Sequence, residues 1–232
     1  MSRFEQRGWM TPEFPQSSSQ VEKGIGLDKS VQRNDRFLGC LLGLAVGDAI
    51  GTAVEFSVPG TFAPVTDMVG GGPFCLQAGQ WTDDTSMALC LAASLVETGH
   101  FDAKDQMDRY LRWRDEGYMS STGRCFDIGG TIGSALRRYE ECGNPFSGSS
   151  NPFSAGNGCI MRLAPVPMFY SPDLALAAQY AAESTRTTHA ASECLESSQL
   201  FATMICAALE GADKSTILES GKTLALSEKK VR

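Results

Sequence analysis

Residues 79–87 read Gly-Gln-Trp-Thr-Asp-Asp-Thr-Ser-Met, and this stretch decides how the rest of the chain is interpreted. Asp83 and Asp84 are adjacent, lie between two threonines, and directly precede an apolar run with helical spacing. In the first turn of a helix two adjacent side chains diverge by about a third of a turn, so both carboxylates can reach one point above the helix N-terminus. Two anions held this close repel each other and require solvent, a cation or a shared proton.

The motif has two interpretations. Threonine and carboxylate oxygens are hard ligands, typical of sites for Mg²⁺, Mn²⁺ or Ca²⁺ rather than zinc. Alternatively, Thr82 or an aspartate caps the helix, and the acidic first turn stabilises the helix dipole. Taken alone, the motif is compatible with both a metal site and a simple helix start.

Composition indicates one helical domain. The chain has 232 residues, of which 42% are apolar, which is enough for one well-buried core. Small residues and methionine are frequent and β-branched runs are scarce, which favours closely packed helices. The net charge of −7, without a run of Lys or Arg, argues against nucleic-acid binding.

The cysteines and the N-terminus indicate the compartment. None of the eight cysteines forms a C-x-x-C pair and only two histidines are present, so a zinc site is not expected. The first residues lack the apolar core of a signal peptide, and no segment approaches about 18 continuous apolar residues. We therefore expect reduced thiols in a cytoplasmic protein that does not bind a membrane.

Residues 1–34 differ from the rest of the chain. Prolines and polar residues dominate without a helical or strand period, which predicts a flexible arm followed by a domain over 35–232. The arm is either a simple leader or, because it carries Phe4, Trp9 and Phe14, a segment that docks on a partner.

The domain opens with glycines spaced four residues apart, at positions 39, 43, 47 and 51. This spacing predicts a buried helix with one smooth face that another backbone can approach closely. Asp48 interrupts the apolar run, and a buried carboxylate must be paired or bound. Glu55 follows on nearly the same helical face, so the two acids predict a polar site at the end of this helix.

Two further segments carry glycines ahead of helical runs. Gly129 and Gly130 precede Thr131, and either cradle an anion with backbone N–H groups or form a tight turn. Residues 156–158 read Gly-Asn-Gly before Arg162, a loop that either places amides and a cation against a phosphate or is purely structural. His189 starts a later helix, where a histidine is either an ordinary polar residue or part of a site.

Four segments in order, residues 39–56, 81–87, 156–162 and 188–189, resemble the ADP-ribosylglycohydrolase family. The resemblance spans about residues 35–209. It implies an all-α fold, a compact orthogonal multi-helix domain, that binds two Mg²⁺ or Mn²⁺ ions. It also implies removal of ADP-ribose from modified side chains, often arginine, by hydrolysis at the C1″ carbon of the distal ribose.

The resemblance also assigns residues one by one. It implies that Thr82, Asp83 and Asp84 are metal ligands, and that Glu55 is an acidic residue near the metals that acts in catalysis or in gating substrate entry. For the proton transfer itself we expect Glu55 or Asp84. The residues that it places around the ribose and diphosphate groups are Gly129, Gly130, Thr131, Gly156, Asn157, Gly158, Met161 and His189.

The sequence departs from the family at its C-terminal end. The family has a second Asp-x-Asp-Thr cluster there, whereas after Leu209 this chain has Asp213 as its only aspartate. The domain is therefore predicted to be incomplete at the C-terminus, with a weakened second metal site.

The expected partner is an ADP-ribosylated protein. The alternative is an immunity or binding protein that neutralises an ADP-ribosylating toxin through residues 1–34, as some members of the family resemble immunity proteins.

Overall fold

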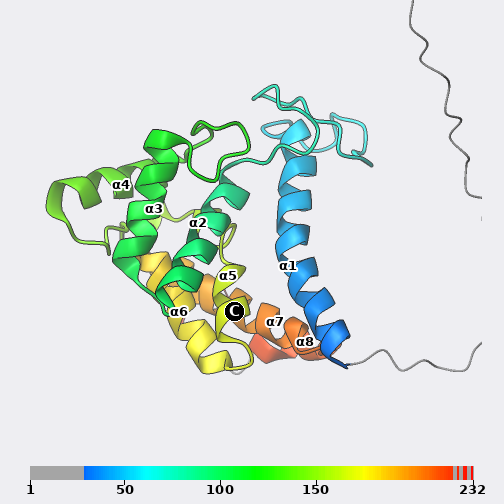
Figure 1. Cartoon of the computed structure of the whole chain (residues 1–232), viewed down its shortest axis with the longest axis vertical. Coiled ribbons are helices and arrows are strands. Elements are labelled where there is room, and N and C mark those ends of the chain that lie inside the picture. Colours follow the sequence, from blue (N-terminus) through cyan, green and yellow to red (C-terminus); the bar gives the residue numbers. More distant parts are fainter. Residues whose placement is uncertain (1–28, 222–223, 225–226, 229–230, 232) are drawn as a thin grey trace, which may run out of the picture.

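The computed structural model describes residues 29–221, 224, 227, 228 and 231 of the chain (Figure 1). All structural statements below concern these residues. Most of the predicted N-terminal arm, residues 1–28, lies outside them. The first helix of the described chain begins at Lys29, which lies within the segment, residues 1–34, that the sequence analysis assigns to the arm.

The described part of the chain is helical, with eight α-helices and three short 3₁₀ helices and no strand. Its α-helices are α1 (Lys29–Gly51), α2 (Asp83–Thr98), α3 (Ala103–Glu116), α4 (Gly130–Cys142), α5 (Pro165–Tyr170), α6 (Leu174–Arg186), α7 (Ser192–Leu209) and α8 (Lys214–Ser220). The 3₁₀ helices are η1 (Thr52–Val54), η2 (Pro152–Ser154) and η3 (Asn157–Cys159). The all-α prediction is confirmed.

Helix α2 is the central element, because it contributes to two hydrophobic clusters. Met87 and Cys90 pack with side chains of α3 and α4, and Trp113 is the largest of these. Leu91 and Leu95 pack with side chains from α5, α6 and α7. These residues repeat at the spacing of a helix buried on two faces, which places the acidic start of α2 at the edge of the core.

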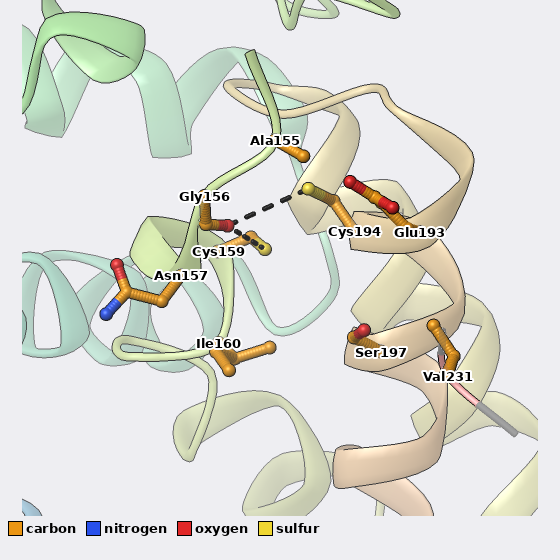
Figure 2. A pocket seen from close by; sticks show the side chains of 9 residues that line it. All are labelled: Ala155, Gly156, Asn157, Cys159, Ile160, Glu193, Cys194, Ser197 and Val231. Carbon is orange, nitrogen blue, oxygen red and sulfur yellow. Dashed lines mark hydrogen bonds between the residues drawn. The ribbon is translucent and has the colours of Figure 1, made fainter. Parts of the chain in front are cut away.

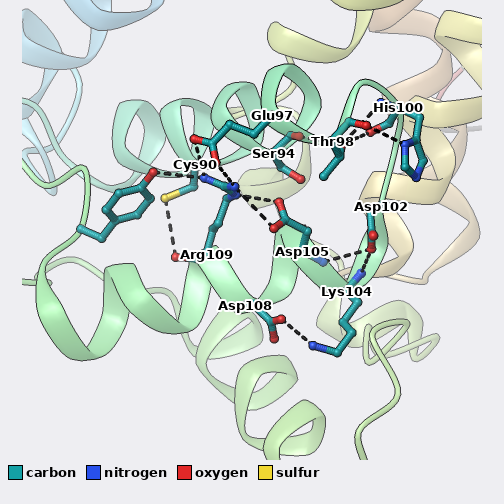
Figure 3. A network of polar contacts seen from close by, with 11 residues as sticks. Cys90, Ser94, Glu97, Thr98, His100, Asp102, Lys104, Asp105, Asp108 and Arg109 are labelled. Carbon is teal, nitrogen blue, oxygen red and sulfur yellow. Dashed lines mark hydrogen bonds and ion pairs between the residues drawn. The ribbon is translucent and has the colours of Figure 1, made fainter.

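A polar network holds α2 against α3 (Figure 3). The Arg109 guanidinium on α3 donates to Glu97 near the end of α2 at 2.8 Å and to Asp105 at 2.7 Å, and it also reaches Tyr118 at 3.2 Å. Arg109 is 7% exposed, so its charge is neutralised by two carboxylates rather than by solvent. Gly99, with φ +74°, ends α2 as the sequence predicts.

Helix α1 is held at both ends. Near its start, Arg36 donates to the Leu209 carbonyl at the end of α7 at 2.6 Å, and Arg33 pairs with Glu210 at 3.2 Å. Near its end, Asp48 contacts the start of α2. Figure 1 shows α1 running along one side of the molecule between these two attachments.

The prediction that α1 is buried is wrong for the described structure. Leu38 is 60% exposed, Leu42 59% and Val46 43%, and Ala49 is the only residue of the helix from Gln32 onward that is buried. A Cβ added to any of its four regularly spaced glycines would meet no atom within 4 Å. The smooth glycine face is present, but no described element packs on it.

One stretch of the described residues, Gln32–Val54, is long and apolar enough to cross a membrane by length and composition, with a mean hydropathy of 1.8. A single helix of this kind does not distinguish a membrane span from a core helix of a soluble protein or from a signal sequence.

Candidate active site

The site begins at the junction of α1 and α2. The carboxylate of Asp48 accepts hydrogen bonds from the backbone N–H groups of Thr82 and Thr85, each at 3.0 Å. The hydroxyls of the same two threonines donate to it at 2.8 and 2.7 Å. Asp48 is therefore satisfied by four donors, and it caps the N-terminus of α2 from a different helix.

This arrangement revises the capping interpretation of the sequence. Thr82 occupies the N-cap position, but its own side chain caps no helix N–H. The first turn is instead capped by Asp48, and the two neighbouring aspartates are left for other contacts. The acidic residues at the start of α2 are therefore not needed to cap the helix.

An acidic cluster surrounds this turn. The carboxyl groups of Asp48, Glu55, Asp83, Asp84 and Asp127 lie near enough to repel one another. The first two residues come from α1 and the turn after η1, the next two from the start of α2, and the last from the loop before α4. Five carboxyls in one place favour either shared protons or bound cations.

Burial dominates the electrostatics of the cluster. Burial first, and then the charges of Asp84 and Asp127, together raise the pKa of Asp83 to about 9. Burial, followed by the charge of Asp127, raises the pKa of Glu55 to about 7. Burial, followed by the charge of Asp48, raises the pKa of Asp84 to about 6. Carboxyls with such raised pKa values are suited to proton transfer near neutral pH.

Asp127 is the residue that sequence reasoning missed. Its backbone has φ +58°, an uncommon conformation for a residue other than glycine, and its side chain hydrogen-bonds with Glu55 and Asp83. In the sequence it lies two residues before Gly129, but it carries no motif that separates it from surface aspartates. The loop that precedes α4 brings it to the cluster.

The oxygen atoms of the cluster are ligands of the kind that a hard divalent cation prefers. Buried carboxylates beside a threonine hydroxyl suit Mg²⁺ or Mn²⁺. Asp83 and Asp84 also hydrogen-bond with each other. Among the described residues no group of three or more His, Cys, Asp or Glu side chains is arranged closely enough to hold a metal ion. A cation would therefore also draw on Thr82 and on water.

The loop over residues 151–162 forms the second part of the site. Asn151 caps η2 by accepting from the Phe153 N–H at 3.0 Å, and the short η3 follows. Gly156 and Asn157 are exposed, whereas Gly158 is buried. The exposed backbone of this loop is available to a ligand.

The buried side chain of His189 packs against this loop. A Cβ on Gly158 would lie 3.0 Å from His189 Cε1 and 3.0 Å from Ile132 Cδ1, so the glycine allows the ring to pack against the backbone. His189 is buried, its Nδ1 hydrogen-bonds with the Thr188 hydroxyl at 2.9 Å, and burial lowers its pKa to about 3. The ring is therefore neutral at pH 7, which favours a supporting role over proton transfer.

The start of α4 connects the two parts of the site. Asp127, in the loop before α4, belongs to the acidic cluster. In the first turn of α4, the Thr131 hydroxyl donates to the Ser154 carbonyl of the loop at 3.3 Å. Gly129 and Gly130 are exposed at the N-terminus of this helix. Their predicted role in anion binding stays a prediction.

Arg162 does not provide the cation suggested by its position after the glycine loop. It is 0% exposed, donates to the Thr188 hydroxyl at 2.6 Å, and its guanidinium lies 4.9 Å from the ring centre of Tyr110. Its Nε and Nη1 have no hydrogen-bond partner in the described structure. Arg162 is therefore part of the interior beneath the loop.

A cavity of about 450 Å³ joins the acidic cluster to the loop. Asp84 lines one wall, Asn157 and Met161 line another, and Leu44 of α1 and Phe201 of α7 complete it. The structure thus brings together residues that the sequence assigns to catalysis and to ligand binding, although they lie more than 70 positions apart. Their individual roles stay predictions.

Known proteins resemble this chain in sequence and in fold. The sequence model described as ADP-ribosylglycohydrolase matches residues 29–232. The ADP-ribosylarginine hydrolase Tri1 of Pseudomonas putida (strain GB-1) is 46% identical over 187 residues, which cover 81% of this chain and 50% of that protein. The corresponding protein of Serratia proteamaculans (strain 568) is 43% identical over 180 residues, 78% of this chain and 49% of that protein.

A solved structure agrees with these relatives. A chain of an "ADP-ribosylglycohydrolase-related protein complex" is 45% identical and superposes with a TM-score of 0.72, covering 85% of this chain and 65% of that chain. None of these comparisons supports the toxin-neutralising alternative. The chain spans about half the length of the curated relatives described above. By its sequence and by its fold, the chain belongs to the ADP-ribosylglycohydrolase family.

Proposed function

We propose that this chain contributes the catalytic half of a site that hydrolyses the bond between ADP-ribose and a modified arginine side chain. The observation that carries the proposal is the 450 Å³ cavity, which is lined by Asp84 together with the loop residues Asn157 and Met161. The names of two relatives, ADP-ribosylarginine hydrolase, support arginine as the modified residue. The substrate is then an ADP-ribosylated protein.

The acidic cluster suits the chemistry of this bond. Cleavage at C1″ develops oxocarbenium-like positive charge on the ribose, which nearby carboxylates stabilise. Glu55 and Asp84, with pKa values raised to about 7 and about 6, are placed to take a proton from the attacking water or return one to the leaving guanidine. Asp127 hydrogen-bonds with Glu55 and keeps its proton near the reacting position.

The loop suits the anionic part of the substrate. The exposed backbone at Gly156 and Asn157 can donate N–H groups to a phosphate, and the absence of side chains at the glycines permits close approach. The neutral His189 ring supports this backbone from the interior.

The cation proposed for this site is Mg²⁺ or Mn²⁺, held by Thr82, Asp83 and Asp84. When bound, it would supply positive charge that orients ribose hydroxyls and activates water. Its affinity is expected to be low, because three ligands from one turn leave most of the coordination of one or two ions to water.

The test measures release of free ADP-ribose from an ADP-ribosylated arginine peptide, with Mg²⁺ and with EDTA. We expect release with Mg²⁺, its loss with EDTA, and a fall of about 100-fold or more in the Asp84→Asn variant. The control is Asp67→Asn, a change at an exposed aspartate away from the cluster, which should leave the rate unchanged. Equal rates for Asp84→Asn and the unmodified protein would exclude Asp84 from catalysis.

A further inference from the structure

Two buried cysteines meet at one backbone carbonyl. The thiol of Cys159 donates to the Gly156 oxygen at 3.6 Å, and the thiol of Cys194 donates to the same oxygen at 3.7 Å. The two sulfur atoms are also close enough for one thiol to donate to the other in place of the carbonyl. Figure 2 shows both sulfur atoms directed at this carbonyl from opposite elements. Cys159 is 2% exposed and Cys194 5%.

The two cysteines differ in their surroundings. Cys159 ends η3 in the loop, whereas Cys194 lies in the first turn of α7, where the helix dipole favours a thiolate. The hydrogen bond from Cys159 is the largest cause that lowers the pKa of Cys194, to about 6. Burial raises the pKa of Cys194 but is outweighed by this hydrogen bond, whereas the same hydrogen bond and burial raise the pKa of Cys159. Burial also raises the pKa values of Cys40, Cys90, Cys125 and Cys206.

The pair can be reached from a second cavity. A space of about 320 Å³ is lined by both cysteines, together with Glu193 and Ser197 of α7. Asn157 and Ile160 line this space and also line the 450 Å³ cavity that contains Asp84. These two loop residues therefore form a wall between the thiols and the candidate active site.

We propose that Cys159 and Cys194 form a thiol–disulfide site that takes a low-molecular-weight disulfide as oxidant, and that the resulting bond weakens nucleotide binding at Gly156–Gly158. The effect on nucleotide binding rests on the proposed function, whereas the thiol–disulfide site does not.

The chemistry proceeds by two exchange steps. The Cys194 thiolate attacks one sulfur of the small disulfide, forms a mixed disulfide and releases the other half as a thiolate, which takes up a proton. Cys159 then loses its proton and attacks the Cys194 sulfur, which releases the second half as a thiol. The two protein thiols are oxidised to one disulfide, and the small disulfide is reduced to two thiols.

The disulfide would act on the loop through Gly156. Oxidation removes both S–H groups that donate to the Gly156 oxygen. It also draws the two Cβ atoms to about 3.8 Å and ties η3 to the first turn of α7. Since Asn157 directly follows Gly156, the backbone that lines the active-site cavity must shift. The displaced backbone would present its N–H groups less well to a phosphate, and the tenfold loss of affinity expected from this corresponds to about 1.4 kcal/mol.

The first experiment maps disulfides in the full chain after equilibration in buffers with increasing ratios of oxidised to reduced glutathione. Acid quenching, alkylation, proteolysis and mass spectrometry identify the linked peptides. We expect the link between Cys159 and Cys194 to form at a lower ratio than any other link, and to be absent from Cys159→Ser and Cys194→Ser. Glutathione adducts confined to the exposed Cys75 and Cys142 would overturn the proposal.

A matched variant makes the assignment specific. Cys142 lies on the same tryptic peptide as Cys159, since no Lys or Arg separates them. The Cys142→Ser variant should keep the link, and its loss there would also overturn the proposal. The mapping of the unmodified chain does not depend on any variant, so a variant that fails to fold leaves the test intact. Circular dichroism identifies such a variant.

The second experiment measures binding of ADP-ribose by calorimetry to the reduced and the oxidised chain. We expect about tenfold weaker binding after oxidation, recovery with dithiothreitol, and no such effect in Cys194→Ser. Unchanged binding by a chain shown to carry the disulfide would overturn the coupling. A disulfide in a chain whose reduced form binds no ADP-ribose would overturn the proposed function and leave the thiol site standing.

Discussion

The carboxylate of Asp48, near the end of α1, accepts the hydroxyl hydrogen of Thr85 in the first turn of α2 at 2.7 Å. The same carboxylate also accepts from the Thr85 backbone N–H at 3.0 Å, so the start of α2 is fixed by a side chain from another helix. This contact orients the adjacent aspartates. Their position in the cavity is therefore determined by the packing of α1 against α2.

Replacing Asp48 by alanine is expected to destabilise the fold by about 2–4 kcal/mol, because four donors lose their common acceptor and Thr82 and Thr85 are buried. Urea unfolding followed by circular dichroism measures the change. The comparison is Asp102→Ala, which removes an exposed cap from α3 and should cost about 1 kcal/mol. A smaller loss for Asp48→Ala than for this control would contradict the assigned role.

Without metal, the thermal stability of the protein is expected to fall as the pH rises from 5 to 8. Burial raises the pKa of Asp83 to about 9, so the folded state keeps a proton that the unfolded chain has already released above pH 4. The native state then binds more protons, and stability decreases with pH across this window. Scanning calorimetry in EDTA measures the slope.

Two controls belong to the pH measurement. Asp83→Asn should flatten the slope, whereas the exposed Asp67→Asn should leave it unchanged. Added Mg²⁺ should stabilise the protein more at pH 8 than at pH 5, because carboxylate ligands must lose their protons to bind it. A stability that rises with pH in EDTA would mean that the buried carboxyls are already ionised at pH 5.

Gly158→Ala is expected to cost about 1–3 kcal/mol of stability and to weaken ADP-ribose binding, since the new methyl group would lie 3.0 Å from His189 and from Ile132. Urea unfolding and calorimetric titration measure the two effects. Gly130→Ala is the matched control for stability, because its added Cβ meets no atom within 4 Å. Equal stability of the two variants would show that the histidine ring does not pack as closely as the structure describes.

The sequence predicted the all-α class, because composition and the helical spacing of apolar residues after Asp84 are local properties of the chain. It also singled out Asp84 and the loop at 156–158, which the structure brings to one cavity, because these residues form compact local motifs. Asp127 and the role of Asp48 as a cap could not be predicted, since both depend on which segments meet in space. The two interpretations of Arg162 could not be separated for the same reason, because only the packed structure shows that its side chain is buried.

The exposed glycine face of α1 gives a further prediction, on stability. Gly43→Ala is expected to stabilise the chain by about 1 kcal/mol, because alanine is the better helix former and the added methyl group meets no atom within 4 Å. Urea unfolding measures this gain, and Gly47→Ala, on the same face, should behave alike. A loss of more than 1 kcal/mol in both variants would mean that another surface packs on this face in solution, since only a close neighbour turns an added methyl group from favourable to unfavourable.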